Sequence, residues 1–457
     1  MITRADEAAR WRKHLAQCPH DALGWHNLAA AEGDLGRAAA AEVAARRAMA
    51  LGITASETRL VLARALQSLG RLDEAASAFD EALRRKPNYA DAHRDYAQLI
   101  WMRTGRKELA LERLDAALRA TPRDPSLHLI CSVVHESADD HHAAIIAANV
   151  GLDRAPSDIG LLLQSAHLAS EFGDAARALS LSSRAASVGA GPRAQIARCE
   201  ALLALGRVDE MMPVVTLLRQ SLHENQYIIA LQATAWRLQG DARYGELHDY
   251  ARLVATQTIG VPPGWSSLTA FLADAVAELG ALHRFVAHPL QQSVRGGGQL
   301  TLQEDHMRRP IIAALFTVLN HAVQNYLAAL GRGEDPMRSR NSGRGAFTGA
   351  WSVRLASGGS HVDHIHPQGW LSSACYLALP GTIGAGTATH PPQTTDRAGW
   401  LRLGRPGIRT APPLEADYFV KPEPGMLALF PAYIWHGVEP FTGDQRRLTV
   451  AFDVVPG

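Results

Sequence analysis

Four side chains that can bind a metal fall within the six positions from His361 to His366. They are His361, Asp363, His364 and His366, and an apolar run of strand length, residues 371–379, follows them closely. Three imidazoles and one carboxylate so close together suit a divalent transition metal. The stretch therefore predicts a metal centre beside a β-strand.

The order of the candidate ligands along the chain indicates a particular kind of centre. Far downstream, a second apolar run is followed by His436. Two early ligands and one late ligand are the order of a 2-His-1-carboxylate iron site, which leaves positions open for a co-substrate and O₂. A strand places residues i and i+2 on one face, so either His361 with Asp363 or His364 with His366 can form the early pair. On a regular strand the two pairs point in opposite directions, so only one of them should hold the metal.

The elements around these residues predict a small all-β domain. Short strand-like runs are separated by Gly and Pro turns at 351–355, 371–379, 426–430 and 448–455. On the last run Arg447, Thr449 and Ala451 share one face, as a pocket wall requires, whereas the alternate positions are apolar. The loop 380–422 is too long for a simple turn and predicts a functional lid.

A helical repeat occupies the N-terminal half. Turn glycines recur at positions 36, 70, 105, 173 and 206, and prolines at 87, 122 and 156 keep the same spacing. A repeat period near 34 residues, with glycines and prolines at these positions, resembles tetratricopeptide repeats over residues 20–240. In one unit Ala138-Asp-Asp-His-His142 replaces the turn glycine. In one unit, Phe79 is expected to fill the gap between neighbouring repeats.

The repeats must stack because no single unit can bury its apolar face, and stacking produces a superhelix with a concave groove. Such grooves usually hold a peptide or a partner protein. The alternative is an array that serves only as a structural or oligomerisation arm.

Two amphipathic helices are predicted between the repeats and the β domain. The first has Ser267 as its N-cap and an apolar face over 268–279, and the second covers 310–330 and ends before Gly331. Both are expected to pack against the outside of the sheet. The glycine-rich stretch 288–301 between them is either a loop that approaches an anion through its backbone or a plain connection.

Composition limits the classes of partner. The 457 residues are 47% hydrophobic and 20% charged, with a net charge of +1, which favours neither nucleic acid nor a membrane surface. Neither a signal peptide nor an apolar stretch of membrane-spanning length is apparent, so a cytoplasmic location is expected. The four cysteines are scattered without Cys-x-x-Cys spacing, which indicates neither a zinc knuckle nor a disulfide framework.

The C-terminal motifs taken together resemble the 2-oxoglutarate and Fe(II)-dependent oxygenases. The resemblance rests on His-x-Asp, on 370–377, on the Gly-Met-Leu-Ala-Leu-Phe-Pro run before His436, and on Arg-Leu-Thr-Val-Ala-Phe-Asp at 447–453. It covers residues 240–457 and is greatest to bacterial and phage members fused to tetratricopeptide repeats. It implies a double-stranded β-helix, a jelly-roll or cupin-like fold.

The resemblance also implies roles for individual residues. His361, Asp363 and His436 match the metal ligands, while Arg447 matches the residue that pairs with the far carboxylate of 2-oxoglutarate, and Tyr376 can hydrogen-bond the co-substrate. The narrower subgroup instead has His-x-His-Pro, which falls on His364-Ile-His366-Pro367 and makes these two histidines the alternative pair. Fe(II), 2-oxoglutarate and O₂ are the implied cofactors.

The sequence thus predicts an α+β multidomain protein. A repeat array at 1–240 is followed by a helical segment and linker at 241–345 and by the oxygenase core at 346–457. The expected activity is hydroxylation of a protein or peptide that the repeat groove recruits. Two alternatives remain open, namely a repeat scaffold with a degenerate β domain and a cupin-type His-x-His…His centre that works without 2-oxoglutarate. An intact Arg447 distinguishes the co-substrate-dependent enzyme from both.

Overall fold

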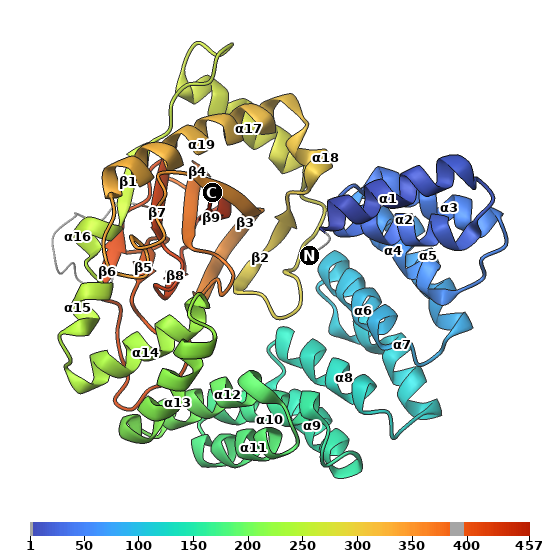
Figure 1. Cartoon of the computed structure of the whole chain (residues 1–457), viewed down its shortest axis with the longest axis horizontal. Helices are drawn as coiled ribbons and strands as arrows, with labels where there is room; N and C mark the ends of the chain where they lie inside the picture. The colour runs from blue at the N-terminus through green and yellow to red at the C-terminus, as the bar shows by residue number, and fades with distance from the viewer. Residues whose placement is uncertain (1–2, 384–396) are drawn as a thin grey trace. The chain divides into compact units, whose positions relative to one another are not determined.

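The computed structural model describes residues 3–383 and 397–457. The chain forms two compact units (Figure 1). The first contains residues 1–154 together with 284–290 and 302–312. The second contains residues 155–283, 291–301 and 313–457, so the later repeats share a unit with the sheet.

Antiparallel helix pairs form the repeat array, as predicted. Those of the first unit are α1 (Arg4–Gln17), α2 (Ala22–Asp34), α3 (Ala38–Ala50), α4 (Ser56–Ser68), α5 (Leu72–Arg85), α6 (Ala90–Thr104), α7 (Lys107–Ala120), α8 (Pro125–Ser137) and α9 (His141–Arg154). Those of the second are α10 (Ile159–Glu171), α11 (Ala175–Ser187), α12 (Gly191–Ala204), α13 (Val208–Ser221) and α14 (Gln226–Gln239), followed by the short α15 (Arg243–Leu247) and α16 (Tyr250–Leu253). Phe79 on α5 is fully buried between repeats, which confirms its expected role.

The repeat turns share a left-handed residue at the end of the first helix of each pair. Gly70 adopts φ +73° and Gly105 adopts φ +63°, a region that glycine enters without steric cost. In the unit without a turn glycine, Asp139 adopts φ +57° at the equivalent position. Aspartate tolerates this conformation better than most residues, so the repeat continues through the degraded stretch.

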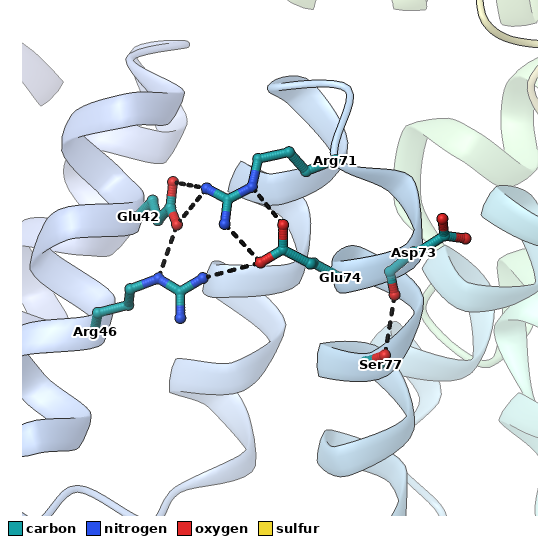
Figure 2. Close-up of polar contacts among 6 residues, drawn as sticks. All are labelled: Glu42, Arg46, Arg71, Asp73, Glu74 and Ser77. Atoms are coloured by element: carbon teal, nitrogen blue, oxygen red, sulfur yellow. Dashed lines mark hydrogen bonds and ion pairs between the residues drawn. The ribbon is translucent and has the colours of Figure 1, made fainter.

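Ion pairs connect neighbouring repeats on the surface. Arg71 donates to both oxygens of Glu42 on α3, at 2.6 and 2.7 Å, and forms a two-bond pair with Glu74 on its own helix (Figure 2). Arg46 lies between the same two carboxylates, 2.8 Å from Glu42 and 3.5 Å from Glu74. Exposed pairs of this kind are screened by solvent and contribute little to stability, so packing of the small and apolar residues remains the main stabilising term.

An antiparallel sheet makes up the C-terminal half-barrel, consistent with a jelly roll. Its order is β1 (Ala255–Thr258), β7 (Met426–Pro431), β4 (Leu371–Ala378), β9 (Arg447–Pro456), β3 (Gly345–His364), β8 (His436–Val438), β5 (Leu401–Leu403) and β6 (Tyr418–Val420), with β2 (Val294–Thr301) paired to β3. The four predicted strand runs lie in β3, β4, β7 and β9, which confirms them.

Both predicted helices are present as α17 (Leu268–Leu282) and α19 (Pro310–Leu330), while the short α18 (Glu304–Met307) precedes the second. Ser267 caps α17 through its side chain, which accepts from the Ala270 amide. α19 lies along the sheet (Figure 1), where Phe316 packs edge-on against Phe347 and Phe452. The expected packing of the helices on the sheet is therefore confirmed.

One sequence expectation about α19 requires correction. By length and composition this 21-residue helix is apolar enough to cross a membrane, although no stretch of that kind was expected. Leu315, Leu319 and Leu327 are fully buried in the protein. A core helix that contributes one face to a sheet and another to neighbouring loops can have the same composition as a membrane span.

The predicted irregular segments contain more structure than expected. The glycine-rich stretch after residue 293 forms strand β2, which pairs with β3. Its glycines allow this pairing, since a Cβ atom on Gly297 would lie 2.4 Å from the Arg354 carbonyl oxygen on β3. Within the long loop 380–422, the described part from residue 397 carries β5 and β6. The predicted lid lies partly in 384–396, outside the described residues.

Candidate metal centre

A β-bulge in β3 determines which histidines face the centre. His361 pairs with Val438 and His364 with His436, and the register shifts between these two pairs. A bulge inserts an extra residue and so reverses the alternation of side chains. As a result His361 and His364, three positions apart, both line one cavity of about 400 Å³.

His364, His366 and His436 come together in this cavity. Their nitrogens lie within 4.8 Å of one another. The ring of His436 is 4.2 Å from that of His364 and 5.0 Å from that of His366, measured between centroids. The Nε2 atoms of His364 and His366 are 3.1 Å apart. The structure therefore assembles the second of the two predicted pairs with the distal histidine.

Hydrogen bonds to Nδ1 orient all three rings. His364 Nδ1 lies 2.9 Å from the Val362 carbonyl oxygen, and His436 Nδ1 lies 3.0 Å from that of Ile434. His366 Nδ1 lies 2.6 Å from Oδ1 of Asp453. Because each partner is an acceptor, each Nδ1 carries the proton and each Nε2 presents a lone pair. Such partners fix the tautomer of metal-binding histidines.

The electrostatics of two of the three rings, His364 and His436, fit a bound cation. Burial lowers the pKa of His364 to about 3, and burial together with the other two rings lowers the pKa of His436. Neutral imidazoles are the form that binds metals. Two nitrogens at about 2.1 Å from one metal and at right angles stand about 3.0 Å apart, which agrees with the 3.1 Å between His364 and His366. Imidazole donors suit iron as well as zinc and copper, so the residues fit Fe(II).

Asp363, the predicted carboxylate ligand, has different partners. Its two oxygens accept from Arg402 Nε at 2.7 Å and from Arg405 Nε at 2.6 Å. Its neighbour in the predicted pair, His361, lines the cavity and has a strongly lowered pKa because it is buried. His361 and His364 each lie 3.3 Å from the Ser293 hydroxyl. The structure thus separates the two members of the pair His361 and Asp363.

The predicted co-substrate residues lie beside each other. Arg447 on β9 lines the cavity, and its guanidinium carbon is 5.1 Å from the ring centre of Tyr376 on β4. Arg447 Nη1 donates to the Gly399 carbonyl at 2.9 Å, but its Nε and the Tyr376 hydroxyl are buried without a hydrogen-bond partner among the residues that the structure describes. Burial raises the pKa of Tyr376 to about 12, so its hydroxyl is a donor. Buried donors without partners are costly, and a carboxylate ligand is a partner that both could share.

Strand parity on β9 agrees with the sequence prediction and extends it. Arg447, Thr449, Ala451 and Asp453 all line the cavity, whereas Val450 and the other alternate residues are buried on the opposite face. Asp453 lies two positions after Ala451, so the same alternation along the strand also identifies it. Ser293 has no comparable signal in the sequence, because β2 was not recognised as a strand.

The last repeat helix braces both ligand-bearing segments. The Gln226 amide, at the start of α14, donates to the carbonyl of Pro367, the residue after His366. Trp435, the residue before His436, donates from Nε1 to the Thr234 hydroxyl at 3.1 Å, and its ring is 5.4 Å from that of Tyr227. α14 therefore contacts the chain next to two of the three clustered histidines.

Comparison with family models locates both halves of the protein. Residues 349–453 match the family described as "Putative 2OG-Fe(II) oxygenase". Residues 60–125 and 102–159 match the tetratricopeptide repeat. The chain combines tetratricopeptide repeats with a 2OG-Fe(II) oxygenase domain. The oxygenase domain contains the histidine cluster, Asp453 and Arg447, and the family implies Fe(II), 2-oxoglutarate and O₂ as cofactors.

Several solved structures match part of this chain. One is pilF of Pseudomonas aeruginosa, with 17% identity over 44% of this chain and 90% of that chain, at a TM-score of 0.34. Another is a tetratricopeptide repeat protein of Parabacteroides merdae, with 14% identity over 50% of this chain and 87% of that chain, at a TM-score of 0.36. A comparison with curated protein sequences finds no match.

Asp453 is expected to determine iron affinity without binding iron. It accepts from His366 Nδ1 and from the Ser372 hydroxyl, the latter at 2.8 Å. Loss of such a partner typically weakens metal binding by about 10- to 100-fold, so Asp453→Ala should do the same in an Fe(II) competition titration. Ser372→Ala is the matched control and should change affinity far less. Equal affinity in wild type and Asp453→Ala would contradict this role.

Proposed function

We propose that the protein is an Fe(II)- and 2-oxoglutarate-dependent hydroxylase whose metal is held by His364, His366 and His436. The proposal rests on one observation above all. In a single cavity, one ring nitrogen from each of three histidines converges near a buried arginine whose Nε has no hydrogen-bond partner in the described part of the chain. The metal with its co-substrate and O₂ supplies the oxidising chemistry, which amino-acid side chains lack.

The residues of the chain have positioning roles in this proposal. Arg447 and Tyr376 bind the far carboxylate of 2-oxoglutarate, and the three histidines hold the metal. Arg447 is 2% exposed, so water is excluded from this end of the cavity and the charge pairing is strong. Asp363 then acts as the partner of Arg402 and Arg405, which ties β3 to β5 and to the residues after it.

The ligand set differs from the 2-His-1-carboxylate pattern, and this observation favours a second candidate. A centre of three histidines without a carboxylate is also the arrangement of a cupin-type metal site that needs no 2-oxoglutarate. In that case Arg447 would be a structural residue. The unpartnered Arg447 Nε and Tyr376 hydroxyl support the co-substrate-dependent enzyme, since a structural arginine is expected to have its donors satisfied.

The proposed substrate is a protein or peptide in the cytoplasm, recruited by the repeats. Tetratricopeptide arrays offer extended surfaces for such partners, and α14 brings the last repeat next to the residues that follow His366. A formal charge of +1 gives no electrostatic support for nucleic acid or a membrane as the substrate.

Anaerobic titration tests this function. Purified protein is loaded with Fe(II) and then with 2-oxoglutarate, while the weak visible charge-transfer band of the iron chelate is followed. The band should form in wild type and in Asp363→Asn and should be absent in His364→Ala. Asn keeps the shape of Asp363, and circular dichroism confirms the fold of each variant.

The other outcomes separate the alternatives. Loss of the band in Asp363→Asn with retention in His364→Ala would assign the metal to His361 and Asp363. Tight iron binding without any band in wild type would leave the cupin-type centre. A wild type that binds neither iron nor 2-oxoglutarate would support a repeat scaffold with a degenerate domain.

A further inference from the structure

A short segment of the chain lies on the repeats of the first unit like a bound peptide. Residues 284–290, Arg-Phe-Val-Ala-His-Pro-Leu, contain neither helix nor strand. Ala287 and Leu290 belong to the apolar core formed with α6, α7 and α8, while Phe285 packs against it and against the neighbouring core. Val286 points outward and is 63% exposed. We call residues 284–290 the linker segment.

Main-chain hydrogen bonds hold the linker segment on α6. The amides of Val286 and Ala287 both donate to the Met102 carbonyl, at 2.8 and 3.1 Å. Met102 lies in the last turn of α6, where carbonyls have no partner within the helix. The Leu290 amide donates to the Gln98 side chain at 3.2 Å. Backbone pairing with pockets for alternate side chains is a general mode of peptide recognition.

The side chains of the linker segment specify what this surface accepts. Arg284 lies over Gly70, where a Cβ atom would be 3.1 Å from its Nε, and Gly70 follows the C-terminal end of α4, which attracts a cation. His288 is buried, with its ring edge-on to Trp101 at 5.8 Å. The accepted pattern is therefore a basic residue, an aromatic residue, an exposed position, a small apolar residue, and a leucine three positions later.

The linker segment leaves one buried hydrogen-bond donor and one cavity of this surface unoccupied. The Trp101 indole nitrogen is buried, and none of the described residues forms a hydrogen bond with it. Next to Gln98, a cavity of about 360 Å³ between α2, α4 and α6 is lined by the ion pair of Arg64 and Asp95. A longer peptide can place a polar side chain in this cavity and still make the same main-chain bonds.

We propose that the α4, α6 and α8 face of the repeats is a peptide-binding surface for which the linker segment is the resident intramolecular ligand. The partner is an extended peptide of the pattern given above, which displaces the linker segment when it binds. The inference rests on the part of the proposed function in which the repeats recruit a peptide, and it needs no iron.

Binding of the chain's own sequence tests the proposal. The probe is a fluorescent peptide with the sequence of residues 284–291, added to the full chain without metal. In wild type the tethered copy competes at the millimolar effective concentration typical of short linkers, so the peptide should bind poorly. The double variant Ala287→Asp with Leu290→Asp disfavours the resident copy and should bind the peptide at least ten times more tightly. Val286→Asp is the matched control, because its side chain is exposed.

Each outcome of this experiment either supports or overturns the proposal. Equal affinity in wild type and the double variant, or absence of binding to a double variant that keeps its helical circular dichroism, would overturn it. If the double variant unfolds, hydrogen exchange in wild type is used instead. Millimolar unlabelled peptide should then speed exchange of the Val286 and Ala287 amides several-fold, and unchanged exchange would overturn the proposal. Binding is measured without iron, so a failed hydroxylase assay would not affect it.

Discussion

Replacement of Arg447 by methionine is expected to raise the 2-oxoglutarate concentration for half-saturation by about 100- to 4,000-fold, the cost of removing one partner of a buried ion pair. The side chain is 2% exposed and its Nε has no hydrogen-bond partner within residues 3–383 and 397–457, so the co-substrate carboxylate is its expected counter-charge. Iron affinity should stay within a few-fold of wild type, because Arg447 belongs to the cavity wall and not to the histidine cluster. The measurement is co-substrate binding followed through the chelate band, together with an Fe(II) titration.

The effect of Arg447→Met on thermal stability provides a second test of this role. In the described part of the chain no acidic side chain pairs with Arg447, so the folded protein pays to bury its charge. Arg447→Met should therefore keep or raise the thermal midpoint measured without co-substrate while it abolishes the increase that 2-oxoglutarate gives wild type. Arg446→Met, at the exposed neighbouring position, is the control and should change neither quantity. A lowered midpoint with unchanged co-substrate binding would make Arg447 a structural residue.

Replacement of Trp435 by alanine should destabilise the second unit by about 3–5 kcal/mol, the usual cost of truncating a large buried aromatic residue. Trp435 is 3% exposed, packs with Ile365 and Ala230, and precedes His436. The cavity left between β8 and α14 should also loosen the histidine cluster, so iron affinity should fall with stability. Chemical unfolding and an Fe(II) titration of the same samples measure both effects.

Two milder variants separate packing from hydrogen bonding at this contact. Trp435→Phe keeps most of the apolar volume, and Thr234→Val removes the acceptor of the indole N–H. Trp435→Phe removes both the donor and its bond and should cost about 1 kcal/mol, whereas Thr234→Val leaves the buried indole N–H without an acceptor and should cost about 1–3 kcal/mol. Both should leave iron affinity close to wild type. If Trp435→Ala costs no more than Thr234→Val, α14 does not brace the centre.

The contact with α14 bears on how the repeats and the oxygenase domain depend on each other. The family match begins at residue 349, yet Pro367 and Trp435, both inside it, bond to residues 226 and 234 of the last repeat helix. An oxygenase domain cut out at the limits of the match would expose Trp435 and Ile365. The later repeats are thus part of the structure around the centre.

Local patterns in the sequence determined the elements. The 34-residue period predicted the helix pairs, because each pair ends where a residue must adopt a left-handed conformation, and Asp139 showed that this need persists without glycine. Period-two alternation predicted the strands and the inward face of β9, including Arg447. The Ser267 cap and the apolar face of 310–330 predicted α17 and α19.

Only the tertiary structure decided which residues gather at the centre. The bulge in β3 reverses the alternation of side chains between His361 and His364. The residue types alone do not predict this bulge, because a bulge depends on how two strands pair. Asp453 reaches His366 across 87 positions through the pairing of β4 with β9. Asp363 forms ion pairs with arginines about 40 residues downstream, at 402 and 405, which the sequence could not assign to it. The sequence therefore predicted the types of residue that can bind a metal. Which of the adjacent candidates gather at the centre was decided by strand register and by charges that long-range pairing brings together.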